Sequence, residues 1–399
     1  MTRALRAALA AAFMIAGAPV APAGALTPPV VDGARLPAAA SPAPPGPTTQ
    51  LAPCAVPVGG VARGVDLAAL VRYSRGAGQR IAVIDTGVNR DARLTHLDAG
   101  GDYVSTGDGT QDCDGHGTAV AGIIADIAPA ATLLAIRQST VKFGAAGDPA
   151  GSGYGDVDTM ARAVRTAADA GATVINISAV ACATGPLHDA ALGAALAYAV
   201  DVRNAVVVTA AGNAGGCPPQ DSAGGELSWA QATVAVSPAW YDDYVLTVGS
   251  LDDAGRPSAF TQPGPWVDVA APGENMVPGA PAGVPVSGTS YAAPVVSGVV
   301  ALLRAHSPGL TARQVMERIR ASARGAAGRR SALVGFGALD PVAALAGSGS
   351  PDPAPAAPVA LPRANRTRRV AVAGAAVCVA VTALALGVLT LTARSRRQQ

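Results

Sequence analysis

Short apolar segments alternate with longer helical patterns through the middle of the chain. The short segments are apolar at consecutive positions and rich in β-branched residues, which is typical of strands buried on both faces. The longer segments predict helices over 157–170 and 187–200, with a further helical run over 295–305. The predicted strands are 81–84, 132–136, 173–177, 205–208 and 245–248.

Strands that alternate with helices predict a doubly wound α/β domain with a mainly parallel sheet. No internal repeat of fixed period is visible, so solenoid and propeller folds are excluded. Ligands of an open parallel sheet bind beyond the carboxyl ends of its strands. We therefore expect the functional side chains in the segments that follow the strands.

The two ends of the chain carry targeting signals. Residues 1–25 combine early arginines, a short apolar run and small residues at 23–25, which predicts a cleaved secretory signal. A retained anchor helix is the weaker alternative, because the run is short and breaks at Pro19. Residues 370–393 form an apolar run long enough to cross a bilayer. A transmembrane helix is predicted there, with a buried core helix as the alternative.

Arginines flank this run on both sides, so charge alone does not orient the helix. A chain that is already being exported would stop at it and leave residues 394–399 in the cytoplasm. The bulk of the protein then lies outside the cytoplasmic membrane. Residues 26–60 and 346–369 are rich in Pro and Ala and predict an extended arm and a stalk. The folded domain is expected over residues 61–345.

Composition narrows the classes of function. The 399 residues are 50% hydrophobic and 14% charged, which excludes a charge-rich disordered protein, and a net charge of +2 does not indicate a nucleic-acid surface. Of five cysteines, one lies in the apolar run 370–393 and four allow three pairings: Cys54, Cys113, Cys182 and Cys217. No Cys-x-x-Cys spacing or EF-hand loop appears, so no metal or other cofactor is predicted, and structural calcium stays open.

Three segments carry side chains of the kind used in nucleophilic catalysis. Asp85 ends the first predicted strand, where an aspartate often only caps a turn. His116 is flanked by glycines before a helix-compatible run, which leaves its imidazole accessible. Ser290 opens a helical run after a glycine turn, where an N-cap serine is the alternative. The other histidines are interpreted as surface or packing residues: His96, His188 and His306.

A fourth segment places Asn213 in a glycine-rich turn after a predicted strand. Its amide could donate a hydrogen bond to an oxyanion or simply support the turn. The chemical groups follow one another in the order Asp, His, Asn, Ser. An α/β-hydrolase is excluded, because Gly288-Thr289-Ser290-Tyr291-Ala292 lacks the second glycine of its motif and the acid and histidine would follow the serine.

Together the four segments resemble those of subtilisin-type serine proteases over residues 80–305. The resemblance implies that Ser290 attacks the peptide carbonyl, that His116 takes and returns its proton, and that Asp85 orients and stabilises the imidazole. It also implies that Asn213 donates to the oxyanion.

The same resemblance implies a substrate-binding surface. Ser178, Ala179 and Val180 would line the pocket for the substrate side chain, where the family commonly has Ser-Leu-Gly. This departure argues against the broad specificity that is usual in the family. Gly153, within 151–155, resembles the edge that pairs with substrate backbone, and the stretch 139–150 before it looks like an insertion.

Over nearly its whole length the chain resembles the mycosins, membrane-anchored subtilisin-like proteases associated with type VII secretion. The resemblance lies in the Pro-rich arm leading to Cys54, in Cys113 just before the histidine motif, in the block 238–249 and in the C-terminal apolar run. It implies the disulfides Cys54–Cys113 and Cys182–Cys217. It also implies a peptide or protein substrate and partners in a membrane secretion complex.

Three functions compete at this point. The first is a serine endopeptidase anchored outside the cytoplasmic membrane. The second is a mainly structural subunit of a secretion complex, with proteolysis secondary. The third is an extracytoplasmic binding module with a relic triad, against which the intact Asp, His, Asn and Ser set argues.

Overall fold

The computed structural model describes residues 24–44, 46–55, 64–147, 151, 153–222, 225–276, 285–325 and 330–347. Most of the predicted signal peptide, nearly all of the stalk, the apolar run 370–393 and the tail 394–399 lie outside these residues. The described residues belong to one compact unit. Within the described ranges, no helix is both long and apolar enough to cross a bilayer.

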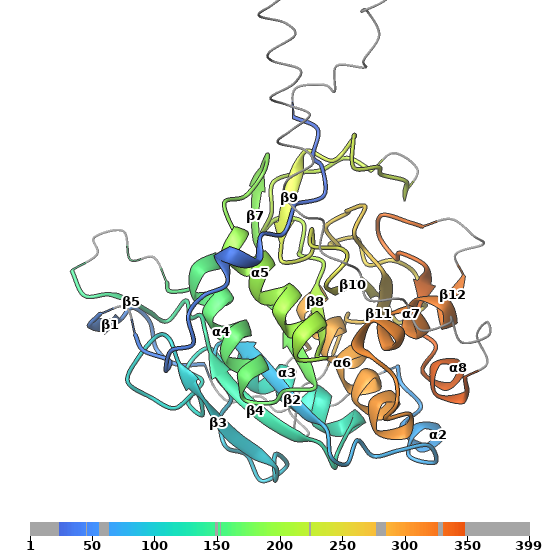
Figure 1. Ribbon diagram of the computed structural model, residues 1–399, viewed down its shortest axis with the longest axis horizontal. Coiled ribbons are helices and arrows are strands. Elements are labelled where there is room, and N and C mark those ends of the chain that lie inside the picture. Colours follow the sequence, from blue (N-terminus) through green and yellow to red (C-terminus); the bar gives the residue numbers. More distant parts are fainter. Residues whose placement is uncertain are drawn as a thin grey trace, which may run out of the picture. The chain divides into compact units, whose positions relative to one another are not determined.

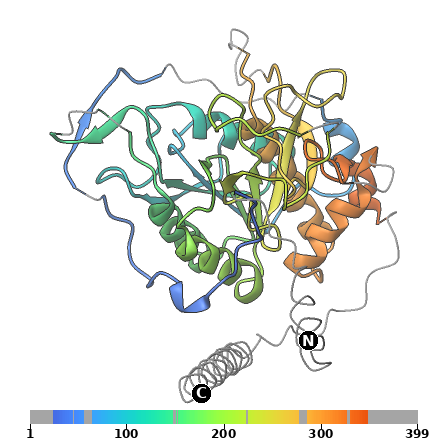
Figure 2. The same ribbon diagram turned by 90° about the horizontal axis from the view of Figure 1, so that it is seen from above.

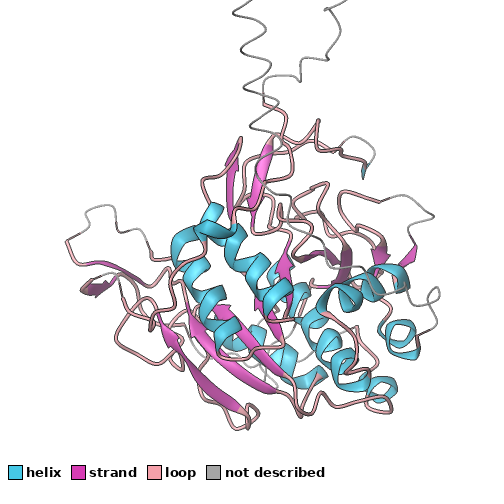
Figure 3. Ribbon diagram, in the orientation of Figure 1, coloured by secondary structure: helices cyan, strands magenta, loops and turns pink. Residues whose placement is uncertain are grey.

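A nine-stranded sheet forms the centre of the described domain (Figures 1 and 3). Its strand order is β12-β13-β11-β10-β8-β6-β2-β4-β3, and every neighbouring pair is parallel except β12–β13. The strands are β2 (Arg80–Asp85), β3 (Leu97–Asp102), β4 (Thr132–Arg137), β6 (Val174–Ile177), β8 (Val206–Ala210), β10 (Leu246–Leu251), β11 (Val269–Pro272), β12 (Arg324–Gly325) and β13 (Gly337–Ala338). The mainly parallel α/β sheet is confirmed.

All five predicted strands are present, as β2, β4, β6, β8 and β10. The sequence does not predict β3, because this edge strand contains polar and glycine residues and exposes part of its length. It also misses β11, β12 and β13, which have only two to four residues each. A strand of two to four residues is too short to show a clear pattern, and an edge strand tolerates polar residues because one of its sides lies outside the sheet.

Helices cover both faces of the sheet, since the consecutive residues from Ile81 to Ile84 of β2 are all fully buried. The helices are α2 (Leu67–Leu70), α3 (His116–Ile127), α4 (Val157–Asp169), α5 (Ala190–Ala197), α6 (Thr289–His306), α7 (Ala312–Ser322) and α8 (Pro341–Ala346). Helix α3 packs on α6, and α4 packs on α5 (Figure 1).

The helix predicted over 187–200 begins later than expected, at Ala190, and ends in a π-helical turn, η2 (Tyr198–Val202). Asp189 precedes it and turns its buried carboxylate to the Trp240 indole and Tyr241 hydroxyl instead of capping the helix. His188 therefore lies outside the helix and is exposed.

The arm predicted over residues 26–60 crosses the outside of the domain, as the blue segment of Figure 2 shows. Its first described part is anchored by Leu26, which is buried and donates a backbone hydrogen bond to Ala232. A 3-10 turn, η1 (Gly33–Arg35), then packs against α5. The described part of this segment is thus mostly extended, and it is tied to the domain along its way.

The arm and the insertion-like stretch 139–150 form a small sheet of their own. β1 (Thr48–Gln50) of the arm pairs antiparallel with β5 (Phe143–Ala145) of the stretch. Beyond β1, Cys54 forms a disulfide with Cys113, three residues before His116. The insertion therefore supplies the strand on which the arm docks beside the candidate catalytic histidine.

A second disulfide joins Cys182 to Cys217. Cys182 lies in β7 (Ala181–Thr184), which pairs with β9 (Val234–Ser237), and Cys217 follows the turn after β8. The structure thus contains both disulfides that the resemblance implies.

Candidate active site

The candidate residues meet at the carboxyl edge of the central strands. β2, β6 and β8 are parallel neighbours, and Asp85, Ser178 and Asn213 lie at or just past their carboxyl ends. His116 is the first residue of α3, and Ser290 is the second residue of α6. The packing of α3 on α6 brings the starts of these helices to the same edge of the sheet.

Asp85 and His116 form the best-defined pair of the site. His116 Nδ1 lies 2.7 Å from Asp85 Oδ1. Asp85 is 1% exposed, whereas the His116 side chain is 29% exposed. A carboxylate acceptor holds the ring proton on Nδ1 and leaves Nε2 with a free lone pair. His116 is therefore oriented to accept a proton from the solvent side of the site.

Two glycines allow α3 to approach Asp85 this closely. Gly115, the residue before the helix, has a φ of 79°, a left-handed conformation that side chains rarely adopt. A Cβ on Gly117 would lie 2.1 Å from the carbonyl oxygen of Gly87. The glycines that flank His116 in the sequence are thus needed for the shape of the site.

Asp112 is a site residue that the sequence analysis misses. It is 4% exposed and accepts hydrogen bonds from the backbone of Gly115 and of Thr118, both at 2.8 Å. Thr86 donates its hydroxyl to Asp112 at 2.9 Å and accepts the Gly117 amide at 3.0 Å. Asp112 therefore satisfies amides at the start of α3 and fixes that end of the helix beside β2. In the sequence, the feature that could have revealed this role is an acidic residue a few positions before a predicted helix, where it can bond the free amides of the first turn.

The charges around His116 favour its protonated form. Burial alone would lower the pKa of His116, but the charge and hydrogen bond of Asp85, together with the charges of Asp112 and Asp114, raise it above the ordinary value of 6.5. Burial raises the pKa of Asp112 itself, and the charge of Asp85 adds to that effect. Three carboxylates thus surround the base.

This electrostatic setting predicts the pH dependence of catalysis. Because only neutral His116 can accept a proton, we expect kcat/KM to fall toward acid pH with a midpoint above 6.5. A pH profile measured with a peptide substrate tests this. Asp114→Asn removes one of the raising charges and should move the midpoint to lower pH. A parent midpoint at or below 6.5 would contradict the electrostatic account.

Ser290 and Asn213 border the same small space. A Cβ on Gly288 would lie 3.1 Å from Ser290 Oγ and 3.4 Å from Asn213 Nδ2. Asn213 Oδ1 accepts hydrogen bonds from the Thr289 amide and hydroxyl, both at 3.0 Å. The backbone amide of Thr289 can only donate, so the Asn213 atom that it contacts is the side-chain oxygen, Oδ1. The side-chain nitrogen, Nδ2, is therefore free to donate a hydrogen bond elsewhere. The arrangement suits an oxyanion that forms next to Ser290 at the start of α6.

Ser290 and His116 come from adjacent helix starts. Among the described residues no hydrogen bond joins Ser290 Oγ to the His116 ring, and catalytic hydrogen bonds are often long before substrate binds. The ring of Tyr291, the residue after Ser290, lies with its centroid 5.3 Å from that of His116. The starts of α3 and α6 therefore lie next to each other, with the Ser290–Tyr291 turn beside the His116 ring.

Ser178 supports the backbone of Ser290. Pro294 lies inside α6 and has no amide hydrogen, so the Ser290 carbonyl lacks the helical donor four residues later. Ser178 Oγ donates to this carbonyl at 2.9 Å. Asn176 donates to Ser178 Oγ at 3.0 Å, and Ser297 donates to Asn176 at 2.8 Å. A buried chain of hydrogen bonds thus connects β6 to the first turns of α6.

This chain predicts a coupling between Ser178 and Pro294. Ser178→Ala should lower the free energy of unfolding by about 1 to 3 kcal/mol, because a buried carbonyl loses its donor. Adding Pro294→Ala restores an amide at position 294 and should recover part of that loss. Denaturant unfolding of both single variants and the double variant measures the coupling. A double variant no more stable than Ser178→Ala would contradict it.

The remaining predicted substrate residues lie around the same edge. A Cβ on Gly212, just before Asn213, would lie 3.4 Å from Val180 and 3.3 Å from the sulfur of Cys217. Ala179 is partly buried against the core. Gly153 lies against the carbonyl of Thr140, next to the backbone pair Thr140–Tyr154. The insertion therefore already occupies one side of the Gly153 segment.

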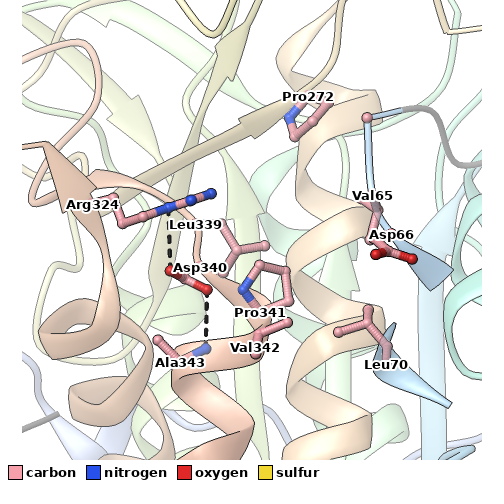
Figure 4. A pocket seen from close by; sticks show the side chains of 11 residues that line it. Val65, Asp66, Leu70, Pro272, Arg324, Leu339, Asp340, Pro341, Val342 and Ala343 are labelled. Carbon is pink, nitrogen blue, oxygen red and sulfur yellow. Dashed lines mark hydrogen bonds and ion pairs between the residues drawn. The ribbon is translucent and has the colours of Figure 1, made fainter. Parts of the chain in front are cut away.

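Within the described ranges, no group of three or more His, Cys, Asp or Glu side chains is placed to hold a metal ion. A cavity of about 500 Å³ lies between α2 and α8 (Figure 4). Asp340 at its rim pairs with Arg324 at 3.2 Å and caps α8 through the Ala343 amide at 3.0 Å. None of the predicted site residues lines this cavity.

Comparison with known proteins agrees with this geometry. The model of the subtilase family matches residues 76–337. Mycosin-4 of Mycobacterium tuberculosis is 54% identical over 369 residues, which cover 83% of this chain and 80% of the relative. The chain belongs to the subtilase family, within the mycosins. As a subtilase it is a serine protease, and the matched region contains the Asp85, His116, Asn213 and Ser290 site.

Solved structures of other mycosins share the fold. The structure of the MycP3 protease from the type VII (ESX-3) secretion system matches with a TM-score of 0.71 and 43% identity, covering 80% of this chain and 99% of that one. A chain in the periplasmic assembly of the ESX-5 inner membrane complex matches with a TM-score of 0.70 and 34% identity, covering 85% and 99%. The fold is thus shared with the MycP3 protease and with a chain of the ESX-5 periplasmic assembly.

Proposed function

We propose that this subtilase is an endopeptidase in which Asp85, His116 and Ser290 form the catalytic triad and Asn213 donates to the oxyanion. The observation that carries this assignment is the 2.7 Å contact between His116 Nδ1 and a fully buried carboxylate, beside a serine that opens a helix. A buried aspartate paired with a partly exposed histidine, next to the start of a helix, supplies both a base and a site for negative charge.

In this mechanism Ser290 Oγ attacks the peptide carbonyl carbon while His116 Nε2 takes its proton. Asp85 stabilises the imidazolium, and Asn213 Nδ2 donates to the oxyanion. The tetrahedral intermediate then collapses, the C–N bond breaks and His116 returns the proton to the leaving amine. Water repeats the sequence on the acyl-enzyme and releases the acid product.

Further parts of the chain complete the proposal. Ala179, Val180 and Gly153 contact the substrate, and Ser178 supports the backbone of Ser290. Residues 1–25 direct export, and residues 370–393 anchor the protein with its protease domain outside the cytoplasmic membrane. The partner is a type VII secretion complex, as the MycP3 and ESX-5 relatives support.

A second function, structural support of such a complex, is favoured by one specific observation. Two related chains, 34% and 35% identical to this one, are parts of ESX-5 inner membrane complex structures. In that case the domain contributes as a subunit, with proteolysis secondary.

Covalent labelling tests the enzymatic proposal. A fluorophosphonate probe should label the parent protein and the exposed-histidine control His96→Ala, but not Ser290→Ala. Absence of labelling in the folded parent would overturn the protease assignment. A secretion assay then separates the two functions. Secretion that survives Ser290→Ala but is lost on deletion of the protein would assign the structural role, whereas equal loss would assign the catalytic one.

A further inference from the structure

The aromatic ring of Tyr291 lies against the imidazole of His116. The two ring centroids are 5.3 Å apart, and the ring planes meet at 49°. Tyr291 directly follows Ser290 in the first turn of α6, and its amide donates to the Gly288 carbonyl at 3.0 Å. The backbone that presents the nucleophile therefore also presents a ring to the base.

Asp85 bonds His116 at a single atom, Nδ1. One hydrogen bond fixes the position of that nitrogen but leaves the tilt of the ring about the bond free. A contact on the body of the ring restricts this tilt, because the Tyr291 ring would clash with some orientations and lose contact in others. Tyr291 thus supplies a constraint that Asp85 alone does not.

Charge develops on this same ring during the reaction. Aromatic faces attract cations that lie within about 6 Å of the ring centroid. The other charged groups that act on His116 are carboxylates, Asp85 from β2 and Asp112 and Asp114 from the segment before α3. The group of α6 that contacts the imidazole is the neutral ring of Tyr291. Burial, with the charges of Asp85 and Asp112, raises the pKa of Tyr291 to about 12, so the phenol stays neutral at physiological pH.

We propose that Tyr291 is a positioning residue for His116, whose ring orients the imidazole and favours the imidazolium formed when Ser290 attacks. The inference rests on the proposed function, because the imidazolium matters only if His116 acts as the base. The aromatic ring, and not the hydroxyl, carries the effect. Tyr291→Phe should therefore preserve it and Tyr291→Leu should remove it.

A histidine titration followed by NMR tests the contact without catalysis. In the inactive Ser290→Ala background, Tyr291→Leu should lower the pKa of His116 by about 0.3 to 1.5 units, whereas Tyr291→Phe should leave it within 0.2 units or so. His306 serves as an internal control, because its own aromatic neighbour, Tyr73, is unchanged. An unchanged His116 pKa in Tyr291→Leu, or an equal shift in Tyr291→Phe, would overturn the proposal.

Kinetics of the same substitutions with Ser290 intact complete the test. Tyr291→Leu should lower kcat by about two- to thirtyfold with little change in KM, and should move the acid limb of kcat/KM to lower pH. A loss of kcat without movement of the acid limb would indicate a merely structural role and contradict the proposal. The titration uses inactive protein, so it tests the Tyr291 contact independently of catalysis. If Tyr291→Leu shifts the pKa of His116 but the parent protein has no peptidase activity, the protease function is overturned and the Tyr291 contact is retained.

Discussion

Ser290→Ala is expected to reduce kcat for peptide hydrolysis about a millionfold, the scale observed when the nucleophile is removed from three catalytic groups that act as a unit. The substitution removes only the Oγ atom of a side chain at the start of α6, so the fold should be retained. Steady-state hydrolysis of a peptide substrate, together with a thermal unfolding curve, measures both parts of the prediction.

The matched control is Ser228→Ala, which removes a hydroxyl bonded to Gln231 in an exposed turn. It should leave kcat and KM unchanged. A Ser290→Ala protein that keeps more than about a thousandth of the parent activity would show that another group attacks the substrate.

Asp85→Asn should lower kcat by about ten thousandfold near neutral pH. The carboxylate accepts the proton of His116 Nδ1 at 2.7 Å, whereas an amide in its place can donate to that nitrogen. The imidazole proton then moves to Nε2, which can no longer accept the proton of Ser290. Loss of the charge also lowers the pKa of His116, since Asp85 is the main group that raises it.

A second buried carboxylate separates this chemical effect from lost stability. Asp268 is fully buried and pairs with Arg320 and Arg330, both at 2.9 Å, just before the amino end of β11 and so away from the carboxyl edge that holds the triad. Asp268→Asn should lower the unfolding temperature but leave kcat of the folded enzyme near the parent value. Equal losses of kcat in Asp85→Asn and Asp268→Asn would mean that the loss of a buried charge, and not the changed tautomer of His116, explains the effect.

The pattern of apolar positions was enough to predict the central strands. Strands such as β2 and β8 are buried on both faces, so their central residues are apolar at consecutive positions. The edge strand β3 and the pairing of β1 with β5 left no comparable pattern, because exposed strands tolerate polar residues. Helix α6 begins at Thr289, next to the Ser290 that the sequence places at a helix start, and continues through Pro294 into the predicted run 295–305.

By itself the sequence determined the fold class, the motif residues and the order Asp, His, Asn, Ser, because these depend on local patterns and on spacing along the chain. Only the tertiary structure decided which side chains support them. Asp112 accepts a hydrogen bond from Thr86 beyond β2, Ser178 donates to the Ser290 carbonyl, and Tyr291 contacts the His116 ring, all around the junction of β2, β6, α3 and α6. Contacts between elements depend on how the elements pack in three dimensions, and no residue pattern along one element encodes that packing.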